Sequence, residues 1–554
     1  MKRSSSTDST RNLGPLIGAI DQGTSSSRFM VFSAHTAELV TYHQIPVLPD
    51  SDCTHKGWIQ CDPMRLLSTV EECIERTIDN MEKLDLDPWD IVAIGITNQR
   101  ESVILWDKNT GKPFYPAILW CDARTEDTTL KKLMSETPYW RHEYVRYNSG
   151  LPIHSYFSAI KVKWLMENVP EVRDAIKEKR VLFGTVDTWL LWNLAERIHV
   201  TDVTNASRTS LMNIETLEWD ENLCSFFGIP MTILPEIRSC SEIYGPLSRG
   251  RLAGVPISGC IGDQQAALVG QKCLRPGEMK ATYGTGCFIL KNIGPKILHS
   301  RRGLLTTVAY KAGPDSLPVY ALEGSISFAG GAVDWLRDCL GINLYELDNV
   351  EDSGDVYFVP AFSGLFSPHW RPDARGIIMG LNRFSSKEHI FRATLEAAAY
   401  QTRDILEAMY EEFNETDSPS SLLVDGGLTE NGSAMQILSD ILGIPVLKPS
   451  MSETTALGAA IMAGRAEGIE VWDTRLESPS TKITVDHFLP HMSREERHRR
   501  YEKWKNAVER SLSWTSLTPK MDMESRLFSS IPCTIFLMTG LILLIVSEKM
   551  KQSP

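Results

Sequence analysis

Short apolar runs joined to turns rich in Asp, Gly, Thr or Ser recur along the chain. Residues 16–20 form the first run, residues 21–27 form a polar segment, and residues 29–32 are apolar again. A similar pairing of run and turn recurs at residues 255–265, 282–290 and 422–427. This pattern predicts buried strands that meet polar turns.

Two later stretches carry apolar residues at helical spacing. The first follows a segment that resembles a capping box, Ser385-Ser386-Lys387-Glu388. Its inward positions are predicted to be Phe391, Leu395, Ala398, Thr402, Ile405 and Met409. In the second stretch these positions are Tyr501, Trp504, Val508 and Leu512. Alternating strands and helices indicate α/β layers, and such folds bind ligands at their strand ends.

The two ends of the chain depart from this pattern. Residues 1–13 are polar and lack a long apolar run, which predicts a disordered leader rather than a secretory signal. Residues 527–546 carry no charge, and a helix of that length spans about 30 Å, roughly one bilayer core. We expect a linker at 515–526 and a tail anchor at 527–546. The alternative is a helix docked on the protein's own surface.

Composition narrows the class of protein. The 554 residues include 42% hydrophobic and 23% charged residues, as in ordinary globular proteins. There are 57 Lys and Arg against 70 Asp and Glu, a net charge of −13, which argues against a nucleic-acid partner. The 11 cysteines form no CxxC pair. We therefore interpret them as buried apolar residues of a reducing compartment.

The polar turns are the candidates for chemistry. The sequence has no P-loop motif, no protein-kinase HRD or DFG motif and no GxSxG nucleophile elbow. Glycine lets a ligand approach the backbone closely, backbone N–H groups bind anions, and Asp supplies oxygen to Mg²⁺. Two such turns facing one another would hold the phosphates and metal of a nucleotide. Plain hairpins are the alternative interpretation.

Eight longer motifs point to one family. They are AIDQGTSSSR at 19–28, GITNQRE at 95–101, LFGTVDTWL at 182–190, TNASRT at 204–209, GDQQAAL at 262–268, YGTGCF at 283–288, VDGG at 424–427 and TALGAA at 455–460. By these motifs the chain resembles the glycerol kinases of the FGGY carbohydrate-kinase family, within the actin-like ATPase superfamily. The resemblance covers about residues 14–514.

The resemblance implies a fold and a reaction. The expected fold is α/β, with two RNase-H-like domains at 14–272 and 273–514, an interdomain cleft between them and an apolar tail helix after them. The implied reaction transfers the γ-phosphoryl group of ATP to glycerol, with Mg²⁺, and gives sn-glycerol 3-phosphate and ADP. The family often forms dimers or tetramers, so a homo-oligomer remains open.

The resemblance also implies roles for individual residues. Asp263 would be the catalytic base, and Asp21 would hold the hydrated Mg²⁺. The residues that would bind glycerol are Arg100, Glu101, Trp120, Tyr156, Asp263, Gln264 and Phe288. The residues that would border the nucleotide are Gln22, Gly23, Thr24, Ser25, Thr285, Gly330, Gly427 and Asn431.

Elementary chemistry supports the polar residues among those that would bind glycerol. Arginine offers only donors, carboxylates only acceptors, and glutamine both. Arg100, Glu101, Asp263 and Gln264 can therefore replace the water around three hydroxyls, since each buried group left unpaired costs about 1–3 kcal/mol. The alternative interpretations are purely structural: a surface ion pair for Arg100 and Glu101 and a turn cap for Asp263.

The sequence departs from the family pattern at three positions. Ser25 replaces the usual Thr, His369 stands where Tyr is usual, and Asp334 adds a charge after Gly330. These departures bear on the rate of catalysis and leave the substrate residues intact. The apolar tail supports an alternative, a weakly active or inactive adaptor on the mitochondrial outer membrane, such as a germ-cell paralogue. A third alternative is an actin-like chaperone. For the kinase we expect the mitochondrial outer membrane, facing the cytosol, with a cytoplasmic pool.

Overall fold

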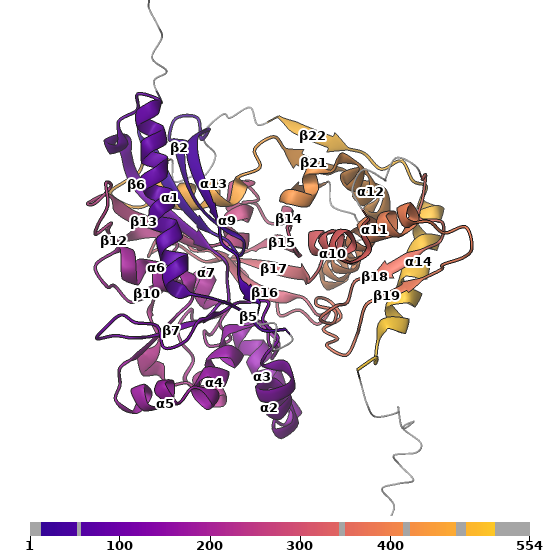
Figure 1. The fold of residues 1–554 in the computed structure, drawn as a ribbon, viewed down its shortest axis with the longest axis horizontal. Helices are drawn as coiled ribbons and strands as arrows, with labels where there is room; N and C mark the ends of the chain where they lie inside the picture. The colour runs from indigo at the N-terminus through magenta and orange to yellow at the C-terminus, as the bar shows by residue number, and fades with distance from the viewer. Residues whose placement is uncertain (1–12, 52–56, 343–349, 414–420, 473–483, 516–554) are drawn as a thin grey trace, which may run out of the picture.

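The computed structural model describes residues 13–51, 57–342, 350–413, 421–472 and 484–515. Two β-sheets, one formed by the first half of the chain and one by the second, dominate it (Figure 1). The predicted tail at 527–546 and most of the predicted leader lie outside the described residues. Within the described residues, no helix is both long enough and apolar enough to cross a bilayer.

The first sheet has six strands in the order β12-β13-β6-β1-β2-β3. Strands β1, β2 and β3 are antiparallel neighbours, and β6 and β13 run parallel to β1. The strands are β1 (Leu16–Gln22), β2 (Ser26–Ser33), β3 (Leu39–Pro46), β6 (Ile91–Asn98), β12 (Ser241–Pro246) and β13 (Pro256–Gly262). Every residue of β1 is buried, as the apolar run at 16–20 predicts.

The second sheet has seven strands in the order β16-β17-β15-β14-β20-β21-β22. Its centre repeats the first sheet: β14, β15 and β17 are antiparallel neighbours, and β20 and β21 run parallel to β14. The strands are β14 (Met279–Tyr283), β15 (Cys287–Gly294), β16 (Leu305–Tyr310), β17 (Val319–Ile326), β20 (Leu422–Asp425), β21 (Val446–Pro449) and β22 (Val485–Phe488). The repeated topology agrees with the predicted pair of RNase-H-like domains.

Helices pack against both sheets (Figure 1). The long ones are α1 (Pro63–Lys83), α11 (Lys387–Phe413) and α14 (Arg494–Ser511). The others are α2 (Lys131–Glu136), α3 (Tyr139–Ser149), α4 (Ser158–Asn168), α5 (Pro170–Lys177), α6 (Val186–Leu194), α7 (Val203–Ala206), α8 (Glu221–Phe227), α9 (Asp263–Gly270), α10 (Gly330–Leu340), α12 (Gly432–Leu442) and α13 (Thr454–Arg465). Short strands pair outside the two sheets: β4 (Asp50–Ser51), β5 (Ile59–Cys61), β7 (Ile104–Asp107), β8 (Ala117–Ile118), β9 (Val181–Gly184), β10 (Val200–Asp202), β11 (Glu236–Arg238), β18 (Tyr357–Val359) and β19 (Ile377–Met379).

One helix of the second half returns to the first sheet. Helix α13 packs against β1, β6, β13 and α9. A Cβ at Gly458 would lie 1.9 Å from the carbonyl oxygen of Ala266, and one at Gly95 would lie 2.2 Å from that of Ala459. Glycine is therefore required at these two close approaches. The expected boundary at 272/273 separates the two sheets, but residues 454–465 pack with the first one.

The predicted helices form with local corrections. The six inward positions expected in the first helical stretch are buried in α11, and Tyr501, Trp504 and Val508 are buried in α14, whereas Leu512 lies just past the end of α14 and is half-buried. The capping box does not form with Ser385, because α11 begins at Lys387; the Ser385 hydroxyl accepts the backbone N–H of Asn382 instead. The turn expected at 262–265 is instead the first turn of α9, which begins at Asp263.

Candidate functional site

Two connected cavities lie where the strand ends of the two sheets meet. The smaller has a volume of about 140 Å³ and the larger a volume of about 480 Å³. The smaller is lined by Thr24, Arg100, Glu101, Trp120, Tyr156, Asp263, Gln264, Thr282, Gly284, Thr285, Gly286 and Phe288. Five of these residues also line the larger cavity: Thr24, Asp263, Gln264, Thr282 and Gly284. The cavities therefore meet around Asp263.

The strand register explains why these residues converge. Strands β1, β6 and β13 are parallel, with Gln22 beside Asn98 and Asn98 beside Gly262. Their carboxyl ends thus deliver the turn after Gln22, the segment containing Arg100, and Asp263 to one edge of the sheet. In the second sheet Thr282 of β14 lies beside Asp425 of β20 in the same parallel arrangement.

Asp263 has one oxygen held by the protein and one that is free. Oδ1 lies 3.2 Å from Nε of Arg100 and accepts the backbone N–H of Gln264 at 2.7 Å. Oδ2 has no hydrogen-bond partner in the described part of the chain. Burial raises the pKa of the Asp263 carboxyl, while the Arg100 guanidinium opposes that rise. The carboxylate is about a quarter exposed, and with one free oxygen it is suited to accept a proton.

A buried ion network supports Arg100 and Glu101. Glu323 of β17 accepts two hydrogen bonds from Arg100, Nη1 to Oε2 at 2.7 Å and Nη2 to Oε1 at 2.8 Å. Arg208 donates to Glu101 through Nε at 2.5 Å and lies 3.2 Å from Glu323. All four side chains are at most 2% exposed. The pair Arg100 and Glu101 is therefore not a surface ion pair.

Three aromatic side chains form an apolar wall of the smaller cavity. The rings of Tyr156 and Phe288 each lie 5.7 Å from that of Trp120, in edge-to-face arrangements. The indole N–H of Trp120 donates to the hydroxyl of Thr24 at 2.9 Å. The smaller cavity thus presents charged groups on one side and ring faces on another.

Acidic groups gather in the larger cavity. Asp21 and Glu453 both line it, and both contact Arg28, at 3.5 Å and 2.9 Å. Burial raises the pKa of Asp21 to about 6; Arg28 opposes this shift, and the charges of Glu453 and Asp263 add to it. A buried carboxylate crowded by other carboxylates is stabilised by a divalent cation, and Mg²⁺ prefers such oxygen ligands. The residues present therefore fit Mg²⁺.

Five of the eight residues predicted to border the nucleotide line one of the two cavities, and three do not. Gly23, Thr24, Ser25 and Gly427 line the larger cavity, and Thr285 lines the smaller one. The lining does not include Gln22, Gly330 or Asn431. Gln22 is fully buried beneath the turn and accepts a hydrogen bond from Gln99. The amide of Gly330 donates to the carbonyl of Gly284, and Asn431 caps α12.

Two of the departures from the family pattern lie outside both cavities. Asp334 pairs with Arg337 at 2.9 Å on the exposed side of α10. His369 contacts Asp404 at 3.2 Å. Neither residue lines either of these two cavities, so Asp334 does not add charge to their lining.

Three buried charges at this site are not among the residues predicted from the sequence. Arg208, Lys280 and Glu323 are fully buried beside the lining residues. A signal was present, because Lys280 and Glu323 are single charges inside otherwise apolar strands, MKATY and VYALEGSI. Charged residues are rarely buried without a partner, so such isolated charges indicate an ion pair or a site.

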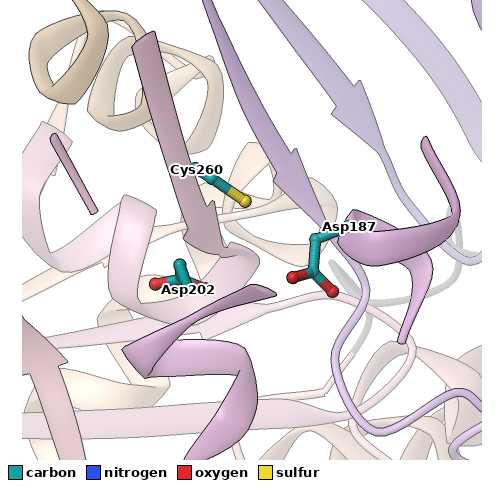
Figure 2. A group of neighbouring side chains, drawn as sticks. All are labelled: Asp187, Asp202 and Cys260. Carbon is teal, nitrogen blue, oxygen red and sulfur yellow. The ribbon is translucent and has the colours of Figure 1, made fainter. Parts of the chain in front are cut away.

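A second cluster of potential metal ligands lies apart from the cavities. Figure 2 shows Asp187, Asp202 and Cys260 converging from α6, the end of β10, and β13. Ligand atoms of the three lie within 4.8 Å of one another. Asp202 already caps α7, and Asp187 accepts the hydroxyl of Thr201 at 2.6 Å. We interpret the cluster as structural.

Two RNase-H-like domains with a small polar pocket opening into a larger acidic cavity define an actin-like ATPase fold. Two family models match, the N-terminal domain of the FGGY family of carbohydrate kinases over residues 16–270 and its C-terminal domain over residues 279–467. The chain belongs to the FGGY family of carbohydrate kinases.

Individual relatives agree with this assignment. The chain is similar to a glycerol kinase of Brucella anthropi, 48% identical over 511 residues, which cover 90% of this chain and 99% of that protein. A probable glycerol kinase of Caenorhabditis elegans is 45% identical over 90% of this chain and 99% of its own length. The crystal structure of Plasmodium falciparum glycerol kinase with ADP superposes with a TM-score of 0.79 at 37% identity, covering 90% of this chain and 98% of that one.

Proposed function

We propose that this chain is a glycerol kinase, which transfers the γ-phosphoryl group of ATP to glycerol and releases ADP and sn-glycerol 3-phosphate. One observation carries the proposal. A small pocket with both donors and acceptors opens at Asp263 into a larger cavity whose acidic and glycine-rich lining suits a metal-bound nucleotide. The names of the relatives identify the substrate that the small pocket would hold.

The small pocket matches the chemistry of a triol. Arg100 donates, Glu101 accepts and Asp263 accepts, so each hydroxyl can exchange its water partners for fixed ones. The rings of Trp120 and Phe288 would cover the carbon backbone. Pairing of every buried hydroxyl matters because one left unpaired costs about 1–3 kcal/mol.

Asp263 would act as the general base. Its Oδ1 is held by Arg100 and by the backbone N–H of Gln264, so Oδ2 remains for the proton of a terminal hydroxyl. That hydroxyl oxygen attacks the γ-phosphorus in line, the bond from phosphorus to the bridging oxygen breaks, and ADP leaves. Positioning and charge neutralisation supply most of the rate enhancement in such transfers. The placement of Asp263 at the junction keeps the base beside the reacting oxygen.

Asp21 would hold Mg²⁺, directly or through water, with Gly23, Thr24 and Ser25 beside the phosphates. When bound, the ion neutralises charge on the phosphate oxygens. Thr285 lines the small pocket on the side of the second domain. Its hydroxyl would donate to the phosphate chain from that side.

The test is ADP release by purified protein with and without glycerol. We expect glycerol-dependent turnover both for the full chain and for residues 1–520, which lack the apolar tail. Binding of ATP and glycerol without turnover would reject the proposal in favour of the adaptor. The relatives reported above give no support to that alternative. One is named a glycerol kinase and the other a probable glycerol kinase, and the similarity covers 99% of the length of each.

We also propose that residues 527–546 anchor the protein in the mitochondrial outer membrane, with the two domains in the cytosol. The support is the charge-free run of twenty residues followed by Lys549 and Lys551. A fluorescent protein fused to residues 513–554 should co-localise with mitochondria. A diffuse signal would reject the anchor, and an endoplasmic-reticulum pattern would reject the assignment to mitochondria.

A further inference from the structure

Lys280 is a buried cation that the proposed mechanism does not use. It lies on β14, its side chain has no solvent exposure, and burial lowers the pKa of its ammonium, an effect that the nearby Asp425 and Asp263 oppose. Its Nζ donates to Oε1 of Gln264 at 2.6 Å and to the hydroxyl of Thr282 at 2.8 Å. Both partners line the two cavities.

The hydrogen bond from Lys280 fixes the orientation of the Gln264 amide. A glutamine amide has one accepting end and one donating end, and an ammonium group can only donate. The amide oxygen must therefore face Lys280. The NH₂ group is the end left for a ligand, and it has no acceptor in the described part of the chain. The side chain thereby presents donors alone.

The same argument applies to Thr282. Its hydroxyl oxygen accepts from Lys280, so its own proton remains available to donate. No protein acceptor for that proton lies within the described residues. Gln264 and Thr282 together offer an NH₂ group and an O–H group at the junction where Asp263 lies. An anion bearing several acceptor oxygens is the matching ligand.

We propose that Lys280 is a positioning residue that holds Gln264 and Thr282 as donors directed at the phosphoryl group in transfer. The proposal rests on the proposed kinase function, and it changes the role of Gln264 from a group able to accept from glycerol into a donor. Preorganised donors of this kind act without reorientation as charge moves onto the transferred group.

The test uses a ligand that resembles the transferred group and does not require turnover. ADP with Mg²⁺ is titrated into full-length protein containing glycerol, with and without aluminium fluoride, and its affinity is measured by calorimetry. Aluminium fluoride supplies a phosphoryl-like group, and transition-state analogues bind more tightly than substrates. We expect it to tighten ADP binding to the unmodified protein.

Lys280→Met should reduce this tightening by about 10-fold or more, because it removes the group that orients both donors toward the charged ligand. Binding of ADP and Mg²⁺ alone should change by less than about two-fold, since the variant removes donors only at the junction. Lys280→Gln gives the same measurement if the Met variant does not fold. Lys291→Met, which removes a buried lysine from the neighbouring strand β15, is the matched control; it should keep the full effect of aluminium fluoride.

A cycle with Gln264→Ala separates positioning from a general loss of stability. Lys280→Met should have a smaller effect in the Gln264→Ala background, where Thr282 alone is left for Lys280 to orient. Additive effects, an unchanged response to aluminium fluoride in Lys280→Met, or no response in the unmodified protein would each overturn the proposal. If the response depends on Lys280 but glycerol does not stimulate ADP release, the kinase proposal fails, and what stands is that Lys280 orients the two donors toward a phosphoryl-like anion.

Discussion

Arg100 of the first domain and Glu323 of the second form a two-point ion pair, with N–O distances of 2.7 and 2.8 Å. Neither side chain is more than 1% exposed. A planar guanidinium held at two points loses most of its freedom. Its remaining nitrogen, Nε, then lies 3.2 Å from Asp263. The second domain thereby orients a substrate-facing side chain of the first.

Glu323→Gln should weaken glycerol binding and destabilise the protein. Removing one partner of a buried ion pair costs about 3–5 kcal/mol, because the remaining charges stay buried. Denaturation in urea measures the stability, and calorimetry with glycerol measures the affinity. Glu396→Gln is the control, since Glu396 is a buried carboxylate paired with Arg392 outside the cavities. An equal loss of glycerol affinity in both variants would contradict the argument.

Asp263→Asn should keep the fold and lose most turnover. The substitution preserves shape but removes the group that accepts the proton, and a positioned base contributes about 10²–10⁴-fold. Steady-state ADP release gives kcat, and circular dichroism checks the fold. Turnover close to that of the unmodified protein would exclude Asp263 as the base.

The catalytic rate should fall as the solution becomes more acidic. The fall should occur at a higher pH than for a base with the ordinary pKa of aspartate. Burial raises the pKa of Asp263, and the base acts only when ionised. Activity is therefore present above this raised pKa and lost as pH falls through it, above the usual value of about 4. The measurement is kcat/KM for glycerol against pH at saturating Mg²⁺. A rate that stays constant down to about pH 4 would be inconsistent with this assignment.

Asp187 should make the protein less stable as pH rises. Burial, followed by the charge of Asp202, raises the pKa of Asp187 from 3.8 to about 7. Between these values the folded state holds more protons than the unfolded state, so the free energy of unfolding decreases with increasing pH. The decrease should be on the order of 1–4 kcal/mol. Urea denaturation across this range should show a shallower slope for Asp187→Asn; parallel slopes would refute the link.

Gly458→Ala should destabilise the contact between α13 and α9. The added Cβ would lie 1.9 Å from the carbonyl oxygen of Ala266, a backbone atom that cannot move aside alone. Overpacking typically costs about 1–3 kcal/mol. Gly432→Ala is the control, because its nearest neighbour would be a ring atom of Phe488 at 3.9 Å. Equal melting temperatures for the two variants would show that the helices separate easily.

The sequence predicts where the strands of this fold end better than it predicts which sheet each helix covers. Buried runs such as residues 16–20 read directly as strands, and the Asp and Gly residues after them mark the ligand edge. Helical spacing identifies α11 by its inward face. Helix α13 is not among the helices predicted above, and apolar spacing would not identify the sheet it covers, because such spacing carries no information about the partner. The isolated charge of Glu323 indicates an ion pair or a site, but the sequence does not identify its partner, because Arg100 is distant along the chain.

The return of α13 to the first sheet affects how the protein is made. The helix that covers part of that sheet is encoded after most of the second domain, with β22 and α14 following it. During synthesis the nascent first domain lacks this cover until residue 465 has emerged from the ribosome. Its apolar surface around Gly95 and Gly259 is exposed for that whole interval. We therefore expect the newly made chain to depend on chaperones until translation is almost complete.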